Sequence, residues 1–318
     1  MKILITGCAG FIGANFTNYW LDTHPQDTVI GVDALTYAAN PSALDALVRR
    51  FGFVFYHANI CDRDVMGTIF QKEAPDLVVN FAAETHVDRS IDSAGIFVQT
   101  NVLGTQVLLD MCLIHGKARF HQISTDEVYG DLPLDSLMRF DESSPLLPSS
   151  PYSASKAAAD LLALSYHRTH GLPVTVSRCS NNYGIYQHEE KLIPKSVYYA
   201  LNGQSIPLYG NGENRRNWIA VYDHCRAIDL VLARGRVGEI YNVASADEKS
   251  NIALVREILR LLDCPSDGYS FVEDRKGHDR SYPIDSTKIE RELGFSPVVD
   301  LESGLRDTVQ YYKSQYKK

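Results

Sequence analysis

The chain of 318 residues contains 45% apolar and 22% charged residues, the balance of an ordinary globular protein. Its 31 Lys and Arg residues against 39 Asp and Glu residues give a formal net charge of −8, which argues against a nucleic-acid-binding surface. We see no apolar run long enough to cross a bilayer and no export signal, so we expect a cytoplasmic protein without a membrane partner. The six scattered Cys residues are expected to be reduced, and no spacing indicates a metal site.

Short apolar runs alternate with helical patterns along the first half of the chain. The runs occupy residues 2–6, 28–33, 53–59, 77–83, 119–125 and 173–179. They are apolar almost throughout, as strands buried on both faces are. The repeated strand–helix–strand order predicts a parallel, doubly wound sheet. We therefore expect a Rossmann-type α/β domain over residues 1–180.

Three glycines lie between the first of these strands and the helix that follows it. Gly7, Gly10 and Gly13 in "ITGCAGFIG" would let the backbone approach a pyrophosphate at the helix N-terminus. The spacing meets the dinucleotide fingerprint only approximately, and a plain strand-to-helix turn is the alternative. Asp33 ends the second strand, 33 − 13 = 20 residues after Gly13, and strengthens the first interpretation. A carboxylate there accepts hydrogen bonds from ribose hydroxyls and repels a 2′-phosphate, so NAD is predicted in preference to NADP.

Two adjacent carboxylates, Asp126 and Glu127, stand in "QISTDEVYG" where an apolar strand breaks. An isolated Asp-Glu pair is best interpreted as a solvated acidic turn. At the carboxyl end of a strand in a doubly wound sheet, however, both side chains can converge on a ligand in the crevice. This position makes them candidates for an acid and a base acting on one substrate.

A tyrosine and a lysine share one face of the next predicted helix, which begins in "SPYSASKAAAD". Tyr152 and Lys156 are four residues apart and so lie one helical turn from each other. We expect the ammonium to lower the pKa of the phenol from its usual value of about 10, so that a phenolate can accept a proton from a sugar hydroxyl. An exposed helix pair is the alternative. The dinucleotide loop upstream favours the catalytic interpretation.

The second half of the chain has more loops and more charged clusters, such as "GNGENRRN" and "EDRKGHDRS". We interpret residues 181–318 as mainly a smaller, mixed α/β substrate-binding domain. Residues 239–245, "EIYNVAS", are expected to form one more strand that returns to the first sheet.

The glycine loop, the Tyr–Lys helix and the chain length together resemble the extended short-chain dehydrogenase/reductase family. The resemblance spans nearly the whole chain and is most specific to the family's nucleotide-sugar 4,6-dehydratases. The blocks that carry it are "NFAAETHVDRSI", "STDEVYG", "PYSASKAAAD", "SRCSNNYGIYQHEEKLIP" and "GHDRSYPIDSTKIERELGF". It implies that the chain removes water from a nucleotide-diphosphate hexose, with dTDP-glucose as the favoured substrate. NAD would oxidise C4 and return the hydride to C6.

The resemblance also assigns roles within these motifs. Asp126 is implied to be the acid at the C6 hydroxyl, and Glu127 the base at C5. Thr125 would hydrogen-bond the C4 oxygen beside Tyr152, and Lys156 completes the catalytic group.

Further residues are expected to bind the cofactor and the substrate. The cofactor set is Gly7, Gly10, Phe11, Ile12, Gly13, Asp33, Thr36, Ile60, Phe81, Ala82, Ala83, Thr100, Tyr152, Lys156 and Asn181. The substrate set is Thr85, Thr125, Asn181, Lys191, Leu192, Pro207, Tyr209, Arg216, Asn251, Asp274 and His278. For Arg178 and Arg280, a role in binding the diphosphate and a surface ion pair stay equally open.

Alternatives remain for the substrate and for the reaction. Asn217 and Tyr222 depart from the residues usual in these dehydratases, so a UDP-sugar substrate stays open. A nucleotide-sugar 4-epimerase shares the glycine loop and the Tyr–Lys pair but needs no adjacent acid and base, and a non-catalytic NAD-binding protein is a third possibility. The resemblance also implies a homodimer formed through the helices at residues 101–116 and 152–170, which carry more apolar positions than one sheet face needs.

Overall fold

The structure is a computed structural model that describes residues 1–116 and 118–316. Within these residues, seven parallel strands form one sheet in the order β10-β6-β5-β4-β1-β2-β3. The strands are β1 (Lys2–Thr6), β2 (Thr28–Asp33), β3 (Phe53–His57), β4 (Leu77–Asn80), β5 (Arg119–Thr125), β6 (Val174–Cys179) and β10 (Ile240–Val243). The predicted doubly wound, Rossmann-type sheet is confirmed, and each expected strand is present.

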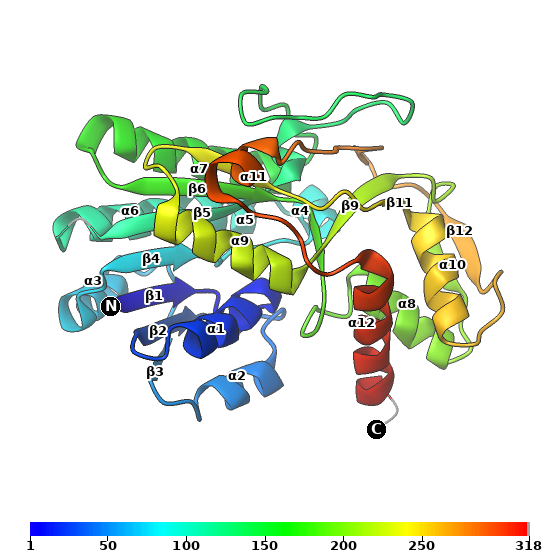
Figure 1. The fold of residues 1–318 in the computed structure, drawn as a ribbon, viewed down its shortest axis with the longest axis horizontal. Coiled ribbons are helices and arrows are strands. Elements are labelled where there is room, and N and C mark those ends of the chain that lie inside the picture. The colour runs from blue at the N-terminus through cyan, green and yellow to red at the C-terminus, as the bar shows by residue number, and fades with distance from the viewer. Residues whose placement is uncertain (117, 317–318) are drawn as a thin grey trace.

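Helices cover both faces of this sheet (Figure 1). One face packs against α3 (Arg63–Glu73), α6 (Thr105–Ile114) and α7 (Pro151–His170), and the other against α1 (Phe11–Thr23) and α9 (Val221–Arg234). Because alternate side chains of β1 enter opposite clusters, Leu4 on one side and Ile3 on the other, this strand is apolar throughout. The shorter helices α2 (Pro41–Leu47), α4 (Val87–Asp92) and α5 (Gly95–Phe97) and a π-type segment (Val98–Gly104) complete the first half.

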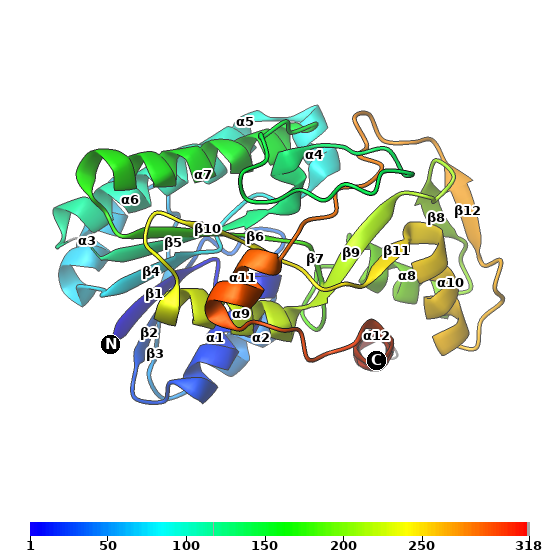
Figure 2. The same cartoon turned by 45° about the horizontal axis from the view of Figure 1, so that its top comes forward.

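A smaller mixed unit stands beside the carboxyl ends of the strands, on the right of Figures 1 and 2. It has a three-stranded sheet, β11-β9-β7, and a pair of parallel strands, β12-β8. Its strands are β7 (Asn181–Tyr183), β8 (Ile206–Tyr209), β9 (Arg215–Ala220), β11 (Glu248–Ser250) and β12 (Tyr269–Val272). Its helices are α8 (Leu192–Leu201), α10 (Asn251–Leu261) and α12 (Leu301–Tyr316), which share one apolar cluster.

More of the second half returns to the large sheet than the sequence predicted. The expected strand is β10, which pairs with β6. In addition, α9 buries Cys225 and Ile228 against the first half, and α11 (Thr287–Leu293) packs beside α9 and β10. We therefore regard the boundary at residue 180 as one that the chain crosses repeatedly.

One helical stretch contradicts the expectation that no apolar run could cross a bilayer. Gly95–Ile114 is 20 residues long with a mean hydropathy of 1.3, which suffices by length and composition. Half of this stretch is buried, and Leu108, Leu109 and Cys112 pack against the sheet. Core helices meet the same two criteria when they cover a sheet.

We predict that Gly13→Ala destabilises the fold, because its new Cβ would lie 2.1 Å from the Gly7 carbonyl oxygen, which is backbone and cannot turn aside. Forced overpacking of this kind costs about 1–3 kcal/mol. Thermal unfolding measures the loss. The matched control is Gly95→Ala, also in a helix, where nothing lies within 4 Å of the new Cβ. Equal unfolding temperatures for the two variants would contradict the close contact.

Candidate active site

Two cavities meet where the carboxyl ends of the sheet face the smaller unit. The first, of about 340 Å³, runs from the glycine loop to Tyr152. The second, of about 360 Å³, lies among β8, β9 and the loop before Tyr282. Both are lined by Thr85, Glu127, Asn181 and Lys191. A ligand in one cavity would therefore share walls with a ligand in the other, as two reacting molecules require.

The glycine loop has the shape that a dinucleotide needs. A Cβ on Gly7 would lie 2.7 Å from the Ala82 nitrogen, so only glycine lets the loop pass this close to β4. Helix α1 begins after Gly10 without a side-chain cap, which leaves N–H groups of its first turn for an anion. The Asp33 carboxylate is held at the end of β2 by the backbone N–H groups of Ala9 and Leu35, at 2.9 and 2.8 Å. These features fit NAD.

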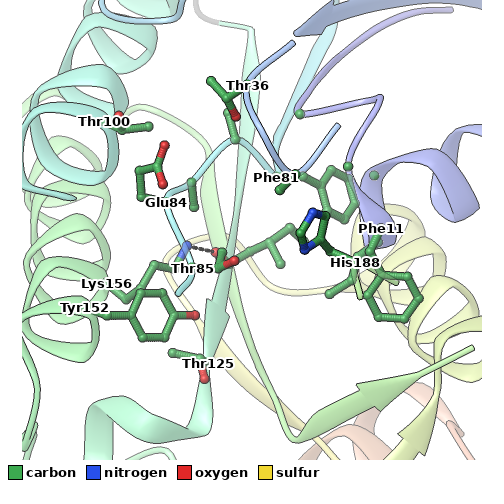
Figure 3. Close-up of a pocket in the computed structure, with 18 of the residues that line it drawn as sticks. Phe11, Thr36, Phe81, Glu84, Thr85, Thr100, Thr125, Tyr152, Lys156 and His188 are labelled. Carbon is green, nitrogen blue, oxygen red and sulfur yellow. Dashed lines mark hydrogen bonds between the residues drawn. The ribbon is translucent and has the colours of Figure 1, made fainter. Parts of the chain in front are cut away.

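The structure brings the expected cofactor residues together around the first cavity. Figure 3 shows Tyr152 and Thr125 on one side of it and Phe11, Phe81 and His188 on the other. The expected residues that line it are Gly7, Gly10, Phe11, Ile12, Gly13, Asp33, Thr36, Ile60, Phe81, Ala82, Ala83, Thr100, Tyr152, Lys156 and Asn181. They come from the ends of β1, β2, β3 and β4 and the segments that follow them, from the π-type segment, from α7 and from the start of β7, so the chain assembles this wall from segments far apart in sequence.

The adjacent carboxylates lie where β5 turns into a short 3₁₀ helix (Asp126–Tyr129). Thr125 causes the turn, because its hydroxyl caps the new helix by accepting the Glu127 N–H at 3.3 Å. The same hydroxyl donates to Asp126 Oδ1 at 3.2 Å. Because the extended strand ends here, Asp126 and Glu127 no longer point to opposite faces, and both line the first cavity.

The two carboxyl groups sit in different surroundings. Asp126 is 2% exposed, and its Oδ2 has no hydrogen-bond partner among the described residues. Burial, followed by the charge of Glu127, raises the pKa of Asp126 well above its usual value. Burial also raises the pKa of Glu127, but the Arg216 guanidinium opposes that shift. Asp126 is thus suited to hold a proton, and Glu127 to release one.

Tyr152 and Lys156 lie together on α7 as predicted, but their electrostatics differ from the expectation. Burial raises the pKa of Tyr152 well above 10, and the charges of Glu127 and Asp126 raise it further, while a hydrogen bond with Thr125 acts in the other direction. The Lys156 ammonium donates to the Ile123 carbonyl at 2.6 Å, and burial lowers the pKa of this lysine. We expected Lys156 to lower the pKa of the Tyr152 phenol. In the protein without ligand this expectation is wrong, because the pKa of Tyr152 is raised.

Most of the expected substrate residues surround the second cavity. Those that line it are Thr85, Asn181, Lys191, Leu192, Pro207, Tyr209, Arg216, Asn251 and His278, while Thr125 lines the first. Asp274 lines neither cavity, and its carboxylate instead bonds to the ring of His278 at 2.6 Å. Arg178 and Arg280 also lie outside both cavities. Arg178 is buried in an ion pair with Asp160, and Arg280 forms an exposed one with Asp131.

Several residues that line the cavities were not singled out from the sequence. Glu190 lines both cavities and is 3.4 Å from the ring of His86. Arg275 lines the second cavity, where Asp88 binds its guanidinium through both carboxylate oxygens and Tyr209 lies under it. The block "QHEEKLIP" and the segment "DRKGHDR" contain these residues, but spacing alone does not show which charges in such a cluster point inward.

The two departures from the usual dehydratase pattern lie away from both cavities. Asn217 is buried in β9 and donates to the Ser245 carbonyl at 3.3 Å. Tyr222 is exposed on α9, edge-on to Tyr19. Neither side chain lines a cavity, so neither contacts a ligand held there.

Comparison with known proteins adds to this geometry. The family model of GDP-mannose 4,6 dehydratase matches residues 4–308. The chain belongs to this GDP-mannose 4,6 dehydratase family. Among its relatives, the dTDP-glucose 4,6-dehydratase of Haemophilus influenzae is 49% identical over 332 residues, covering 98% of each chain. The expected resemblance to the nucleotide-sugar 4,6-dehydratases is confirmed.

Solved structures of the same family agree. The dTDP-glucose 4,6-dehydratase of Streptomyces venezuelae, a structure with NAD bound, is 47% identical, covers 100% of this chain and 98% of its own, and superposes with a TM-score of 0.96. A UDP-glucose 4-epimerase of Thermotoga maritima is 28% identical, covers 99% of both chains and has a TM-score of 0.91. The fold is therefore shared between the two reaction types, and the site must separate them.

We predict that Asp126→Asn stabilises this family member at neutral and alkaline pH, by on the order of 1 kcal/mol or more. Because the pKa of Asp126 is raised in the folded state, the stability that this carboxyl contributes is present below its unfolded pKa and lost as pH rises through the folded pKa. The amide does not titrate, so the difference between variant and wild type should shrink in acid. Thermal unfolding across pH measures it. Exposed Glu213→Gln is the control, and a difference independent of pH would contradict the assignment.

Proposed function

We propose that the chain is an NAD-dependent dTDP-glucose 4,6-dehydratase, a lyase that forms dTDP-4-keto-6-deoxyglucose and water. The observation that carries this proposal is the pair Asp126 and Glu127. These two residues are adjacent and shielded from bulk water, and their surroundings differ. Both lie next to Tyr152 in a cavity that fits NAD. The names of the similar dehydratases support the substrate, and the NAD in their structures supports the cofactor.

The cofactor would be held by the glycine loop, by Asp33 at the adenosine ribose, and by Lys156 and Asn181 farther along the cavity. When bound, NAD supplies a hydride acceptor at C4 of the hexose and a hydride donor at C6. Because this hydride would leave and return within one cycle, NAD would not be consumed.

The chain's own residues move the protons. Tyr152, in its ionised form, would accept the proton of the C4 hydroxyl, and Thr125 would hold the C4 oxygen. Once C4 is a ketone, the C5 proton is acidic, and Glu127 removes it. Asp126, protonated through its raised pKa, gives its proton to the C6 hydroxyl, which leaves as water. Glu127 then returns a proton to C5 when C6 is reduced.

The nucleotide diphosphate would occupy the second cavity. Lys191, Arg216 and Arg275 are among the cationic residues that line it, as are His278 and Tyr209, whose rings meet edge to face. Arg216 is held rigidly, since it donates to the carbonyls of Arg215 and Asp279 at 2.7 and 2.9 Å. A fixed guanidinium here binds a phosphate with little loss of side-chain entropy.

A 4-epimerase is the weaker alternative. It would use the same cavity, Tyr152 and Lys156, but it loses no water and needs no protonated acid. The buried Asp126, with Oδ2 left without a partner among the described residues, would have no task in that reaction. A UDP-sugar dehydratase would use all of the same residues and is separated only by substrate preference.

We further propose that the protein is a cytoplasmic homodimer. Leu103 and Ile114 are exposed apolar residues whose spacing places them on one side of the helix that contains α6, and Leu161 is exposed on neighbouring α7. Two copies that pair these helices would bury this surface. All six cysteines are free, which suits a reducing compartment.

The reaction itself is tested by incubating the protein with dTDP-glucose and, in parallel, with UDP-glucose. We expect a 4-keto-6-deoxy sugar from dTDP-glucose. We predict that Glu127→Gln lowers the rate by about 100-fold or more, because the base at C5 is lost. Mass spectrometry in deuterated water measures C5 exchange, which should stop, while NAD still binds. Normal dehydration by this variant, or a C4 epimer as the wild-type product, would overturn the proposal.

For the dimer, we predict that Leu103→Glu shifts the mass in solution from two chains to one, because a charge would be buried in the paired surface. Light scattering measures the mass. Phe51→Glu is the matched control, since Phe51 is 97% exposed on the turn before β3. A wild-type monomer, or equal masses for the two variants, would contradict the proposed interface.

A further inference from the structure

A buried ion pair between Asp160 and Arg178 lies one turn of α7 beyond Lys156. Asp160 follows Lys156 by one turn of α7, and its side chain is fully buried. Its Oδ2 accepts hydrogen bonds from Arg178 Nε at 3.0 Å and from Ser124 Oγ at 2.9 Å. Its Oδ1 has no partner among the described residues. A buried ion pair often adds little to the free energy of unfolding. Stability alone therefore does not explain why Asp160 and Arg178 are buried here.

Three consecutive residues of β5 meet three successive turns of α7. Thr125 hydrogen-bonds with Tyr152, the Ile123 carbonyl accepts from Lys156, and Ser124 donates to Asp160. The strand that ends in the two carboxylates is thus fixed, residue by residue, to the helix that carries the phenol and the ammonium.

The hydrogen-bond network extends from Arg178 to the end of the 3₁₀ helix that begins with the two carboxyl groups. Arg178 donates from Nη1 to the Tyr129 hydroxyl at 2.9 Å, and that hydroxyl donates to Asn242 Oδ1 at 2.8 Å. Tyr129 ends the 3₁₀ helix that begins at Asp126. Arg178 therefore connects α7 with the end of the segment that carries both carboxyl groups.

We propose that Asp160 is a positioning residue that, from one turn of α7 away, keeps the Lys156 ammonium charged, with Arg178 holding Asp160 ionised in turn. This inference rests on the NAD binding in the proposed function. Lys156 has three N–H donors, one of which Ile123 uses, and the others remain for a ligand in the cavity that it lines.

The other groups near Lys156 cannot take over this task. Burial lowers the pKa of Lys156, and Asp160 is the larger of the two charges that oppose it; the other is Cys179. Burial raises the pKa of the Cys179 thiol to about 12, so it is neutral at working pH. Tyr152 and Asp126, which line the same cavity, have raised pKa values, so in the protein without ligand neither supplies an anion as readily. Of the two charges that oppose burial at Lys156, Asp160 is therefore the one available as an anion; burial raises the pKa of Asp160 too, but the charges of Arg178 and Lys156 oppose that rise.

The test is NAD affinity of the purified protein from neutral to alkaline pH, measured by fluorescence titration without substrate. Asp160→Asn should make NAD affinity fall at a lower pH than in wild type, because Lys156 then loses its proton earlier. Arg178→Gln should lower that pH by no more than Asp160→Asn does, because Asp160 is retained but loses the cation that favours its ionised form. The double variant Asp160→Asn with Arg178→Gln leaves no unpaired buried charge and should fold. It should show the same shift as Asp160→Asn.

Exposed Glu213→Gln, which removes one negative charge far from α7, should leave the profile in place. An unshifted profile in the folded double variant, or a larger downward shift in Arg178→Gln than in Asp160→Asn, would overturn the inference. The dehydration assay is separate. If wild type binds NAD with the stated shifts but forms no keto sugar, the proposed function fails while the role of Asp160 stands.

Discussion

The burial of two carboxyl groups side by side is the constraint on which the site depends. Taking one carboxylate out of water is costly, and taking two adjacent ones is costlier, so one of them keeps a proton. Here the different surroundings of the two carboxyl groups decide which of them keeps the proton. Asp126 is closed in with one oxygen unpartnered, while Glu127 faces the second cavity and Arg216. The protein thereby holds a donor and an acceptor of protons at one point, next to a cavity that fits NAD.

The surrounding elements of the fold hold the two carboxyl groups in this position. Strand β5 ends at Thr125, whose hydroxyl both caps the turn and bonds to Asp126. Helix α7 runs along the same strand and begins with a capping box at Ser150, which fixes where Tyr152 enters the cavity. The smaller unit supplies Arg216 on β9, so the base responds to the part of the molecule that would hold the diphosphate. In the proposed reaction, Glu127 would therefore link catalysis and substrate binding electrostatically.

The large sheet could be predicted because its strands are buried on both faces and therefore stand out as apolar runs in the sequence. Gly7 and Asp33 could be predicted because their chemistry is local to one turn and one strand end. Glu190 and Arg275 could not be predicted as wall residues, since their direction depends on contacts with His86 and Asp88, about a hundred or more residues away. The raised pKa of Tyr152 was missed for a similar reason. Spacing showed the lysine four residues away, but not how deeply the phenol is buried among carboxyl groups.

The central claim is that one pocket oxidises the hexose, removes water from it and reduces the product, and that neither the sugar nor the NAD is released between these steps. The most direct measurement follows a deuterium atom placed at C4 of dTDP-glucose through a reaction in ordinary water. The account predicts a product that carries this deuterium at C6 and none at C4. Deuterium lost to water, or retained at C4 of an epimer, would contradict it.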